Sequence, residues 1–294
     1  MTTAISVAGL GKTYRDVTAL DGVSFAIQEN TICGVLGRNG AGKTTAMQII
    51  TGHAKPSSGS VDVFGRAPFE DRDAMSSMCF VKESQRYPDE FKVKHVLASA
   101  ADLLPQWDQG FADDLLGKFD LPTGRRVKKL SRGMHSMLGI IIGLASRAPV
   151  TLFDEPYLGL DVVARQMFYD ELLADYAAHP RTIVLSTHLV DEVANLLEHV
   201  VLIDGGRVLI DDCAENLRRR AVVATGGTAH IDDLAAGRTE LRRETLGTQA
   251  RVTLQGDFTD DDLARARERG VDIAPASLQQ LMIGATGTEG RQAS

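Results

Sequence analysis

The hydrophobic residues of this 294-residue chain recur with two spacings, one typical of strands and one of helices. Alternation over residues 4–27 predicts two antiparallel strands joined around Tyr14, Arg15 and Asp16. Short unbroken apolar runs predict buried strands at 31–36, 78–81, 150–153 and 181–188. Apolar residues at helical spacing predict helices at 43–50, 94–119 (two helices separated by Pro105), 132–145 and 162–176. The pattern predicts an α/β fold with a mixed sheet, an antiparallel β subdomain and a helical insertion over about 84–148.

The pattern changes character near residue 214. A glycine-containing hairpin over 200–210 closes the first unit. After it come three arginines at 218–220, a short apolar run, two small helical patterns, a strand-like segment at 250–254 and a closing helix near 275–283. The sequence therefore predicts two domains, 1–213 and 214–294, and the second is a small α/β accessory domain without a chemical motif.

Composition narrows the class of protein. A hydrophobic fraction of 44% and a charged fraction of 24% are those of an ordinary globular protein. A net charge of −7 argues against a dominant nucleic-acid surface, and three cysteines far apart argue against a disulfide framework. The longest apolar stretch, 137–145, falls short of the roughly 20 residues that a membrane helix needs. The start of the chain lacks the pattern of a secretory signal.

One glycine-rich stretch fits the phosphate-binding pattern G-x-x-x-x-G-K-[ST] at every fixed position. It consists of Gly37, Arg38, Asn39, Gly40, Ala41, Gly42, Lys43, Thr44 and Thr45. It follows a predicted buried strand and opens a predicted helix, so backbone N–H groups and the helix N-terminus would converge on a phosphate. Lys43 would reach the β- and γ-phosphates, and Thr44 would bind Mg²⁺. An ordinary glycine-rich turn would not need the Lys-Thr pair in this context.

Polar residues follow the other predicted buried strands. Asp154 and Glu155 end one strand; beside phosphates, one carboxylate would complete the Mg²⁺ shell and the next would polarise water. His188 ends another strand and Glu83 follows a third, although a structural histidine and a surface loop are the ordinary interpretations. Parallel strands deliver such side chains to one crevice, where these residues would meet the phosphate loop.

Two further residues allow two interpretations each. Ser131 is a good N-cap for the helix at 132–145, and the free N–H groups of that helix could also meet an anion. Tyr14, at the turn between the first two strands, is either a half-buried packing residue or a stacking platform for an aromatic base.

The order of these motifs resembles that of the ATPase subunits of ABC transporters, over residues 4–212. The Walker A motif is matched by 37–45, the LSGGQ signature loosely by 130–134, and Walker B by 150–154, with Glu155 as the catalytic glutamate. The D-loop matches 159–161 and the H-loop histidine is His188. Tyr14 falls at the A-loop position, so the resemblance favours stacking on the adenine base.

Departures from the family pattern occur at four positions. Arg132 replaces the usual glycine of the signature and Met134 its glutamine. Glu83 aligns with the Q-loop glutamine, while Gln85 lies two positions later, and either could serve. Tyr157 replaces the common threonine or serine. The combination LSRGM, a Q-loop glutamate and DEPYLGLD is similar to the Ytr-type branch of bacterial exporter ATPases, which implies an ABC-2-type permease.

The resemblance implies a mechanism and partners. Two cassettes, in a homodimer or a heterodimer, would sandwich two ATP molecules, each between one phosphate loop and the other subunit's signature and D-loop residues: Ser131, Arg132, Gly133 and Asp161. Glu155 would activate water, His188 would contact the γ-phosphate, and Thr44, Asp154 and Glu83 would hold Mg²⁺. An integral-membrane permease would bind the helical insertion, and no nucleic acid is expected. The subunit would be cytoplasmic, peripheral at the inner face of the cell membrane.

Two other functions are compatible with parts of the pattern. A soluble ABC-type ATPase acting on a ribosome or nucleic acid would be expected to carry tandem cassettes, a long coiled coil or a basic arm, which this sequence does not show. A regulatory module would hold nucleotide without hydrolysing it. Asp154, Glu155 and His188 speak against such a module, whereas the altered signature at Arg132 keeps it open.

Overall fold

The computed structural model describes residues 2–82 and 85–292, with side chains as far as residue 286. Its strands are β1 (Thr3–Tyr14), β2 (Val17–Gln28), β3 (Ile32–Leu36), β4 (Ser58–Val63), β5 (Met78–Val81), β6 (Val150–Asp154), β7 (Thr182–Thr187), β8 (His199–Asp204), β9 (Arg207–Cys213), β10 (Ala221–Gly227), β11 (Thr239–Leu246), β12 (Gln249–Gln255) and β13 (Asp272–Pro275). Its α-helices are α1 (Lys43–Ile50), α2 (Arg72–Ser76), α3 (Val93–Leu103), α4 (Gln109–Lys118), α5 (Arg132–Ala145), α6 (Val162–Ala178), α7 (Val190–Val193), α8 (Ala214–Arg219), α9 (Thr228–Ala235), α10 (Asp260–Glu268) and α11 (Leu278–Gln292). These elements build three sheets, and the central one positions the candidate site.

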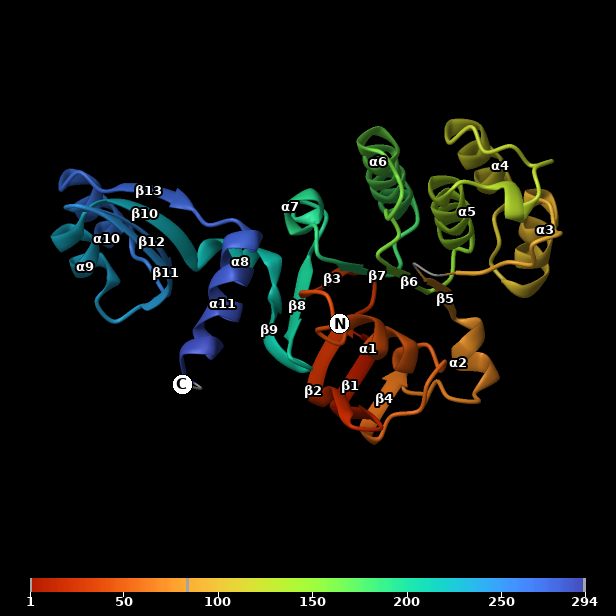
Figure 1. The fold of residues 1–294 in the computed structure, drawn as a ribbon, viewed down its shortest axis with the longest axis horizontal. Helices are drawn as coiled ribbons and strands as arrows, with labels where there is room; N and C mark the ends of the chain where they lie inside the picture. The colour runs from red at the N-terminus through yellow and green to blue at the C-terminus, as the bar shows by residue number, and fades with distance from the viewer. Residues whose placement is uncertain (1, 83–84, 293–294) are drawn as a thin grey trace.

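The central sheet has the order β5-β6-β7-β3-β8-β9 (Figure 1). Its first five strands are parallel and β9 runs antiparallel to β8. The register pairs Leu36 with Thr187 and Asp154 with Ser186, so β3, β6 and β7 end at the same edge. Side chains and loops that follow these strands therefore lie together, as the sequence predicted.

Both faces of the central sheet are covered. Strands β3, β6 and β7 are buried along their whole length, which explains their unbroken apolar runs. Helices α3 to α6 gather over one face, while α1 and the antiparallel sheet β2-β1-β4 cover the other (Figure 1). Each face contributes to its own hydrophobic core. This layering leaves the strand ends as the place where polar groups can gather.

The helical group begins and ends where the sequence predicts. The predicted interruption near Pro105 separates α3 from α4, and Asp108 caps α4 by accepting a hydrogen bond from Phe111 N at 2.8 Å. Ser131 caps α5 in the same way, with Met134 N as the donor at 3.2 Å. A side-chain cap thus fixes both helix starts, and the one at Ser131 was predicted from the sequence.

The C-terminal part forms a four-stranded antiparallel sheet, ordered β11-β12-β10-β13, with α9 and α10 against it (Figure 1). The hydrophobic pattern did not predict β11, because nearly all of its residues are exposed and polar. The closing helix, predicted near 275–283, is α11.

Helix α11 joins the C-terminal sheet to the rest of the molecule. Leu278 and Leu281, at its start, belong to the same buried core as Val190 and Val193 of α7. One turn further on, Gly284 lies so close to β11 that a Cβ on it would be 2.3 Å from the Cβ of Leu241. The main core therefore includes residues on both sides of position 213/214. The division into two domains at that position stays a prediction. No helix in residues 2–82 and 85–292 is long and apolar enough to cross a membrane.

Candidate functional site

The phosphate-loop motif lies where β3 ends and α1 begins. Gly37 has φ 154° and Gly42 has φ 111°, values that favour glycine. Side chains would also collide here: a Cβ on Gly37 would lie 2.2 Å from the carbonyl oxygen of Ile203, and one on Gly42 would lie 2.6 Å from that of Ala19. Backbone conformation and close packing therefore both require glycine at these two fixed positions of the motif.

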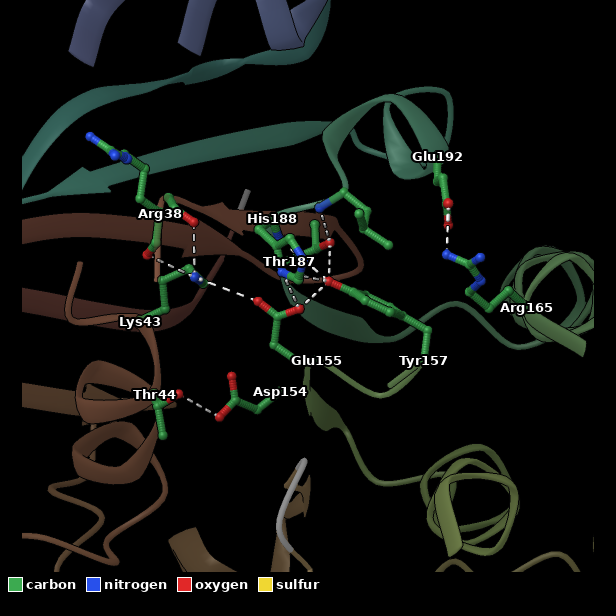
Figure 2. Close-up of polar contacts among 12 residues, drawn as sticks. Arg38, Lys43, Thr44, Asp154, Glu155, Tyr157, Arg165, Thr187, His188 and Glu192 are labelled. Carbon is green, nitrogen blue, oxygen red and sulfur yellow. Dashed lines mark hydrogen bonds and ion pairs between the residues drawn. The ribbon is translucent and has the colours of Figure 1, made fainter. Parts of the chain in front are cut away.

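Lys43 is buried inside its own loop. Its ammonium donates hydrogen bonds to the carbonyl oxygens of Gly37, at 2.9 Å, and Arg38, at 3.2 Å. The same Nζ lies 3.5 Å from Oε1 of Glu155 (Figure 2). The loop thus holds a buried positive charge that faces the carboxylate at the end of β6.

The loop's open side adjoins a pocket of about 480 Å³. The residues that line it are Arg38, Asn39, Gly40, Ala41, His188, Asp204 and Gly205. Phosphate-loop residues and the histidine after β7 therefore face one space, although the sequence separates them by about 150 residues.

Thr44 and Asp154 form the candidate metal position. Thr44 Oγ1 donates to Asp154 Oδ2 at 2.7 Å (Figure 2), whereas Asp154 Oδ1 is buried and has no hydrogen-bond partner among the described residues. A buried carboxylate oxygen without a partner is costly, and a cation would satisfy it. No group of three His, Cys, Asp or Glu side chains that could hold a metal is found in the described ranges. Mg²⁺ suits such a site, since it often takes one or two protein ligands and completes its shell with phosphates and water.

Glu155 follows Asp154 directly and has an unusual backbone. Its φ is 50°, rare for a residue with a side chain, and its N–H donates to the carbonyl of Ser186 at 3.1 Å. Its Oε2 lies 2.8 Å from His188 Nδ1. The carboxylate is thus placed between Lys43 and His188, and the three predicted residues meet as expected.

Tyr157 also belongs to this cluster, and the sequence did not single it out as a site residue. Its hydroxyl contacts Oε2 of Glu155 and lies 2.7 Å from Thr187 Oγ1 (Figure 2). Burial, together with the hydrogen bond to Glu155, raises the pKa of the Tyr157 hydroxyl far above its ordinary value. One feature of the sequence could have indicated this role: Tyr157 departs from the family pattern and lies only two residues after the predicted catalytic glutamate.

The remaining predicted residues lie elsewhere or have local partners. Tyr14 is 45% exposed, with Lys12 Nζ 4.9 Å from its ring centre. Asp161 caps α6 through Ala164 N at 2.8 Å, and Ser131 caps α5. None of these three has a hydrogen bond or ion pair to the phosphate loop within the part of the chain that the structure describes. A single chain thus brings together only the phosphate loop and the ends of β6 and β7.

The signature and Q-loop positions have their own local surroundings. Arg132 and Gly133 pack on the D-loop, since a Cβ on Gly159 would lie 2.8 Å from Arg132 Cγ and one on Gly133 would lie 2.6 Å from the Gly159 carbonyl oxygen. Glu83 lies outside the described residues. Gln85, the other candidate, donates from its backbone N–H to Lys82 O at 3.2 Å.

Known proteins are similar to this chain in both sequence and fold. The ABC transporter family model matches residues 20–158. The chain is 31% identical to the daunorubicin resistance ATP-binding protein DrrA3 of Streptomyces coeruleorubidus over 238 residues, which cover 76% of this chain and 72% of the relative. The chain belongs to the ABC transporter ATP-binding proteins. It is also 29% identical over 294 residues to the Nod factor export ATP-binding protein I of Burkholderia thailandensis, with 95% of each chain covered.

Solved structures agree on the fold. The ATP-binding subunit of an ABC transporter superposes with a TM-score of 0.67 at 24% identity, over 74% of this chain and 92% of that one. A dimeric, post-hydrolysis ATP-binding cassette with ADP and phosphate gives 0.63 at 21% identity, over 71% and 98%. The predicted fold class is confirmed: an ABC-type α/β ATPase domain with an antiparallel β subdomain and a C-terminal α/β region.

This ABC ATPase is an ATP-binding and ATP-hydrolysing subunit that powers a transporter. ABC ATPases dimerise and pair with a membrane permease. The family assignment therefore favours the transporter interpretation over a ribosome-associated ATPase or a module that only binds nucleotide.

Proposed function

We propose that this ABC ATPase hydrolyses ATP at the cluster where the phosphate loop meets the ends of β6 and β7, and that hydrolysis drives an ABC-2-type exporter. The observation that carries the proposal is the position of the Glu155 carboxylate. It lies 3.5 Å from Lys43 Nζ and 2.8 Å from His188 Nδ1, directly after the Asp154 that contacts Thr44. A buried carboxylate in this place can orient and activate a water molecule against a γ-phosphate.

Each residue of the cluster has a distinct role in this proposal. Lys43 and the loop N–H groups bind the β- and γ-phosphates, and His188 contacts the γ-phosphate. Thr44, Asp154 and Glu83 hold Mg²⁺, which neutralises phosphate charge when it is bound. Negative charge that develops on the γ-phosphate is thereby met by positive groups that are already held in place, so they stabilise it without rearranging.

The remaining predicted residues act in a dimer. Ser131 and Arg132 are exposed at the start of α5, where free N–H groups favour an anion. We assign them, with Gly133 and Asp161, to the nucleotide held by a second cassette. Tyr14, which is partly exposed, stacks on the adenine base. ATP then joins two cassettes, and hydrolysis releases them.

The relatives suggest the direction of transport. Two of them are named for Nod factor export and for daunorubicin resistance. We extend export to this chain, through an ABC-2-type permease that docks on the helical insertion and keeps the subunit at the inner face of the membrane. We also retain the division into a cassette, 1–213, and an accessory domain, 214–294.

Steady-state ATPase rates of wild type and Glu155→Gln test the hydrolytic site. We expect the substitution to lower kcat at least about a hundredfold, because it removes the base while it preserves shape. Glu171→Gln is the matched control, since Glu171 lies on α6 and pairs with Lys118 at 2.8 Å, away from the cluster. A Glu155→Gln variant that hydrolyses ATP as fast as wild type would sink the proposed site.

Mixing two inactive variants tests the shared site. Lys43→Ala removes the phosphate-binding side of a site and Ser131→Arg blocks the opposite side, so a mixed dimer regains one intact site. We expect activity to return on mixing and not in either variant alone. If the mixture stays inactive while wild type is active, two copies of this chain do not share the site.

Co-purification of a permease from detergent-solubilised membranes tests the transport partner. Recovery of the chain with ribosomes instead would contradict the proposed transport function.

A further inference from the structure

The hydroxyl of Tyr157 lies at the centre of the polar cluster at the ends of β6 and β7. The side chain is 3% exposed, and its hydroxyl contacts Glu155, Thr187 and His188 (Figure 2). The tyrosine therefore connects the loop after β6 with the loop after β7. Its place beside the carboxylate suggests a role in the reaction besides packing.

Each hydrogen bond of the Tyr157 hydroxyl has a defined donor and acceptor. The Tyr157 hydroxyl has a single proton, and because the Glu155 carboxylate can only accept, that proton goes to Oε2. Thr187 Oγ1, 2.7 Å away, must then donate its proton to the Tyr157 oxygen, which also accepts the His188 N–H at 3.3 Å. The Leu189 N–H donates to Thr187 Oγ1 at 2.9 Å and holds the threonine in place.

The two oxygens of the Glu155 carboxylate consequently differ. Oε2 accepts from the Tyr157 hydroxyl and lies 2.8 Å from His188 Nδ1. Oε1 lies 3.5 Å from Lys43 Nζ and makes no hydrogen bond to the described residues. One oxygen is thus held by the protein, and the other is directed to the phosphate-loop lysine.

We propose that Tyr157 is a positioning residue that fixes Glu155 Oε2 against the loop after β7, so that Oε1 is the oxygen presented to the nucleotide. This inference rests on the role proposed for Glu155. A glutamate side chain that can rotate must give up that freedom before it acts, and a rigid tyrosine anchored by Thr187 removes this cost in advance. The same hydroxyl also contacts the histidine, so Glu155 and His188 are held as one unit.

The hydroxyl has to sit at the end of a long, buried side chain to do this. Burial keeps it protonated and therefore a donor, and the ring packs beside the His188 imidazole with centroids 6.1 Å apart. The hydroxyl of a serine at this position would lie too near the backbone to bridge Thr187 and Glu155. Tyr157→Phe preserves the packing and removes only the bridge, whereas Tyr157→Ser removes both.

The test is a comparison of kcat and KM for ATP in four variants. For Tyr157→Phe we expect kcat to fall about tenfold, since a hydrogen bond to a charged group is lost, while KM stays within about twofold because phosphate contacts are untouched. Thr187→Val removes the hydroxyl that anchors Tyr157, one contact away from Glu155, so we expect a smaller fall in kcat. Thr187→Ser retains that hydroxyl, so kcat should recover relative to Thr187→Val. Tyr176→Phe is the matched control, because its hydroxyl donates to Glu198 at 2.7 Å outside the cluster, and it leaves kcat unchanged.

The outcomes separate this inference from the proposed site. If Tyr157→Phe lowers only the melting temperature, with kcat at or above wild type in the folded protein, Tyr157 is structural and the inference is wrong. Equal losses in Tyr157→Phe and Tyr176→Phe also overturn it, since they indicate a general effect of losing a hydroxyl. A Glu155→Gln variant with wild-type activity defeats the proposed site itself, whatever Tyr157→Phe does.

Discussion

Charged side chains are buried at the edge of the central sheet, whereas in the C-terminal sheet they lie nearer the surface. Lys43, Asp154 and Glu155 are buried beside one another at the ends of parallel strands. In the C-terminal sheet, Thr253 is the one buried polar side chain among the described residues, and the core is otherwise apolar. Its charged side chains form ion pairs nearer the surface, such as Arg238 with Asp262 at 2.6 Å.

This difference teaches where chemistry can occur in the molecule. Buried charges interact strongly, but burying them costs free energy, and a fold retains them where they do work. Parallel strands make this possible because their ends meet at one edge, whereas neighbouring antiparallel strands end on opposite edges. The C-terminal sheet, whose strands are antiparallel, does not gather side chains at one edge in this way.

The largest expected effect is on the buried lysine. We expect Lys43→Ala to lower ATP hydrolysis by at least about a hundredfold, because the site loses the buried ammonium that lies 3.5 Å from Glu155 and that we assign to the phosphates. Arg243→Ala, in β11, provides the comparison in the C-terminal sheet and should leave the rate unchanged. ATPase assays with both variants measure this, and similar losses would remove the contrast between the two regions.

Core truncation should separate activity from stability. Leu254→Ala, in the C-terminal sheet, should lower the free energy of unfolding by about 2–5 kcal/mol because it leaves a cavity. The folded variant should retain wild-type kcat, since Leu254 lies in the separate apolar core of that sheet. Leu152→Ala in β6, two residues before Asp154, is the matched variant and should lose both. Thermal unfolding and ATPase rates measure the pair, and a fall in kcat for Leu254→Ala would show that the two regions are coupled.

A smaller effect is expected where the regions touch. The Gln279 amide of α11, oriented with its nitrogen toward α7, donates to the Asp191 carboxylate. Removing it with Gln279→Ala should lower stability by about 0.5–1 kcal/mol, because both side chains are exposed and water competes for the contact. Gln249→Ala, at an exposed site on β12, is the control. If chemical denaturation gives equal stabilities for the two variants, this contact contributes nothing.

The smallest effect concerns acid titration on the C-terminal surface. Hydrogen bonds from the Thr259 hydroxyl and N–H, followed by the charge of Arg238, lower the pKa of Asp262 from 3.8 to about 2. Because the folded pKa is the lower one, the stabilisation is present above the unfolded value near 3.8 and is lost as pH falls through about 2. NMR titration of the Asp262 carboxyl should show this pKa, and Thr259→Ala should raise it. An ordinary pKa in the wild-type protein would contradict the assignment.

The sequence predicted the central fold well because its signals were local. Fixed glycines, the Ser131 cap and fully apolar strands all depend on near neighbours in the chain, and the structure has each in place. Strand β11 could not be predicted, since an exposed strand with charged residues lacks an apolar alternation. Its position depends on pairing with the next strand, β12, and on packing against α11, which comes much later in the chain.

The predicted residues of the site and the one that was missed differ in the same way. Lys43, Thr44, Asp154 and Glu155 carry recognisable motifs, so their meeting followed from parallel-strand topology. Tyr157 carries no motif, and its role depends on the 2.7 Å contact with Thr187, thirty residues away. Roles that need a second subunit, such as that of Ser131, depend on surfaces that one chain does not bring together.

Helix α11 also has a consequence for the order in which the chain is made. Synthesis runs from the N-terminus, so every residue of the catalytic cluster has left the ribosome before Leu278 and Leu281 appear. Until then, α7 lacks part of the apolar surface that covers it in the finished protein. The core of the cassette can be completed only after the C-terminal sheet has been translated. A truncated product without α11 would therefore expose apolar side chains of α7, directly after His188.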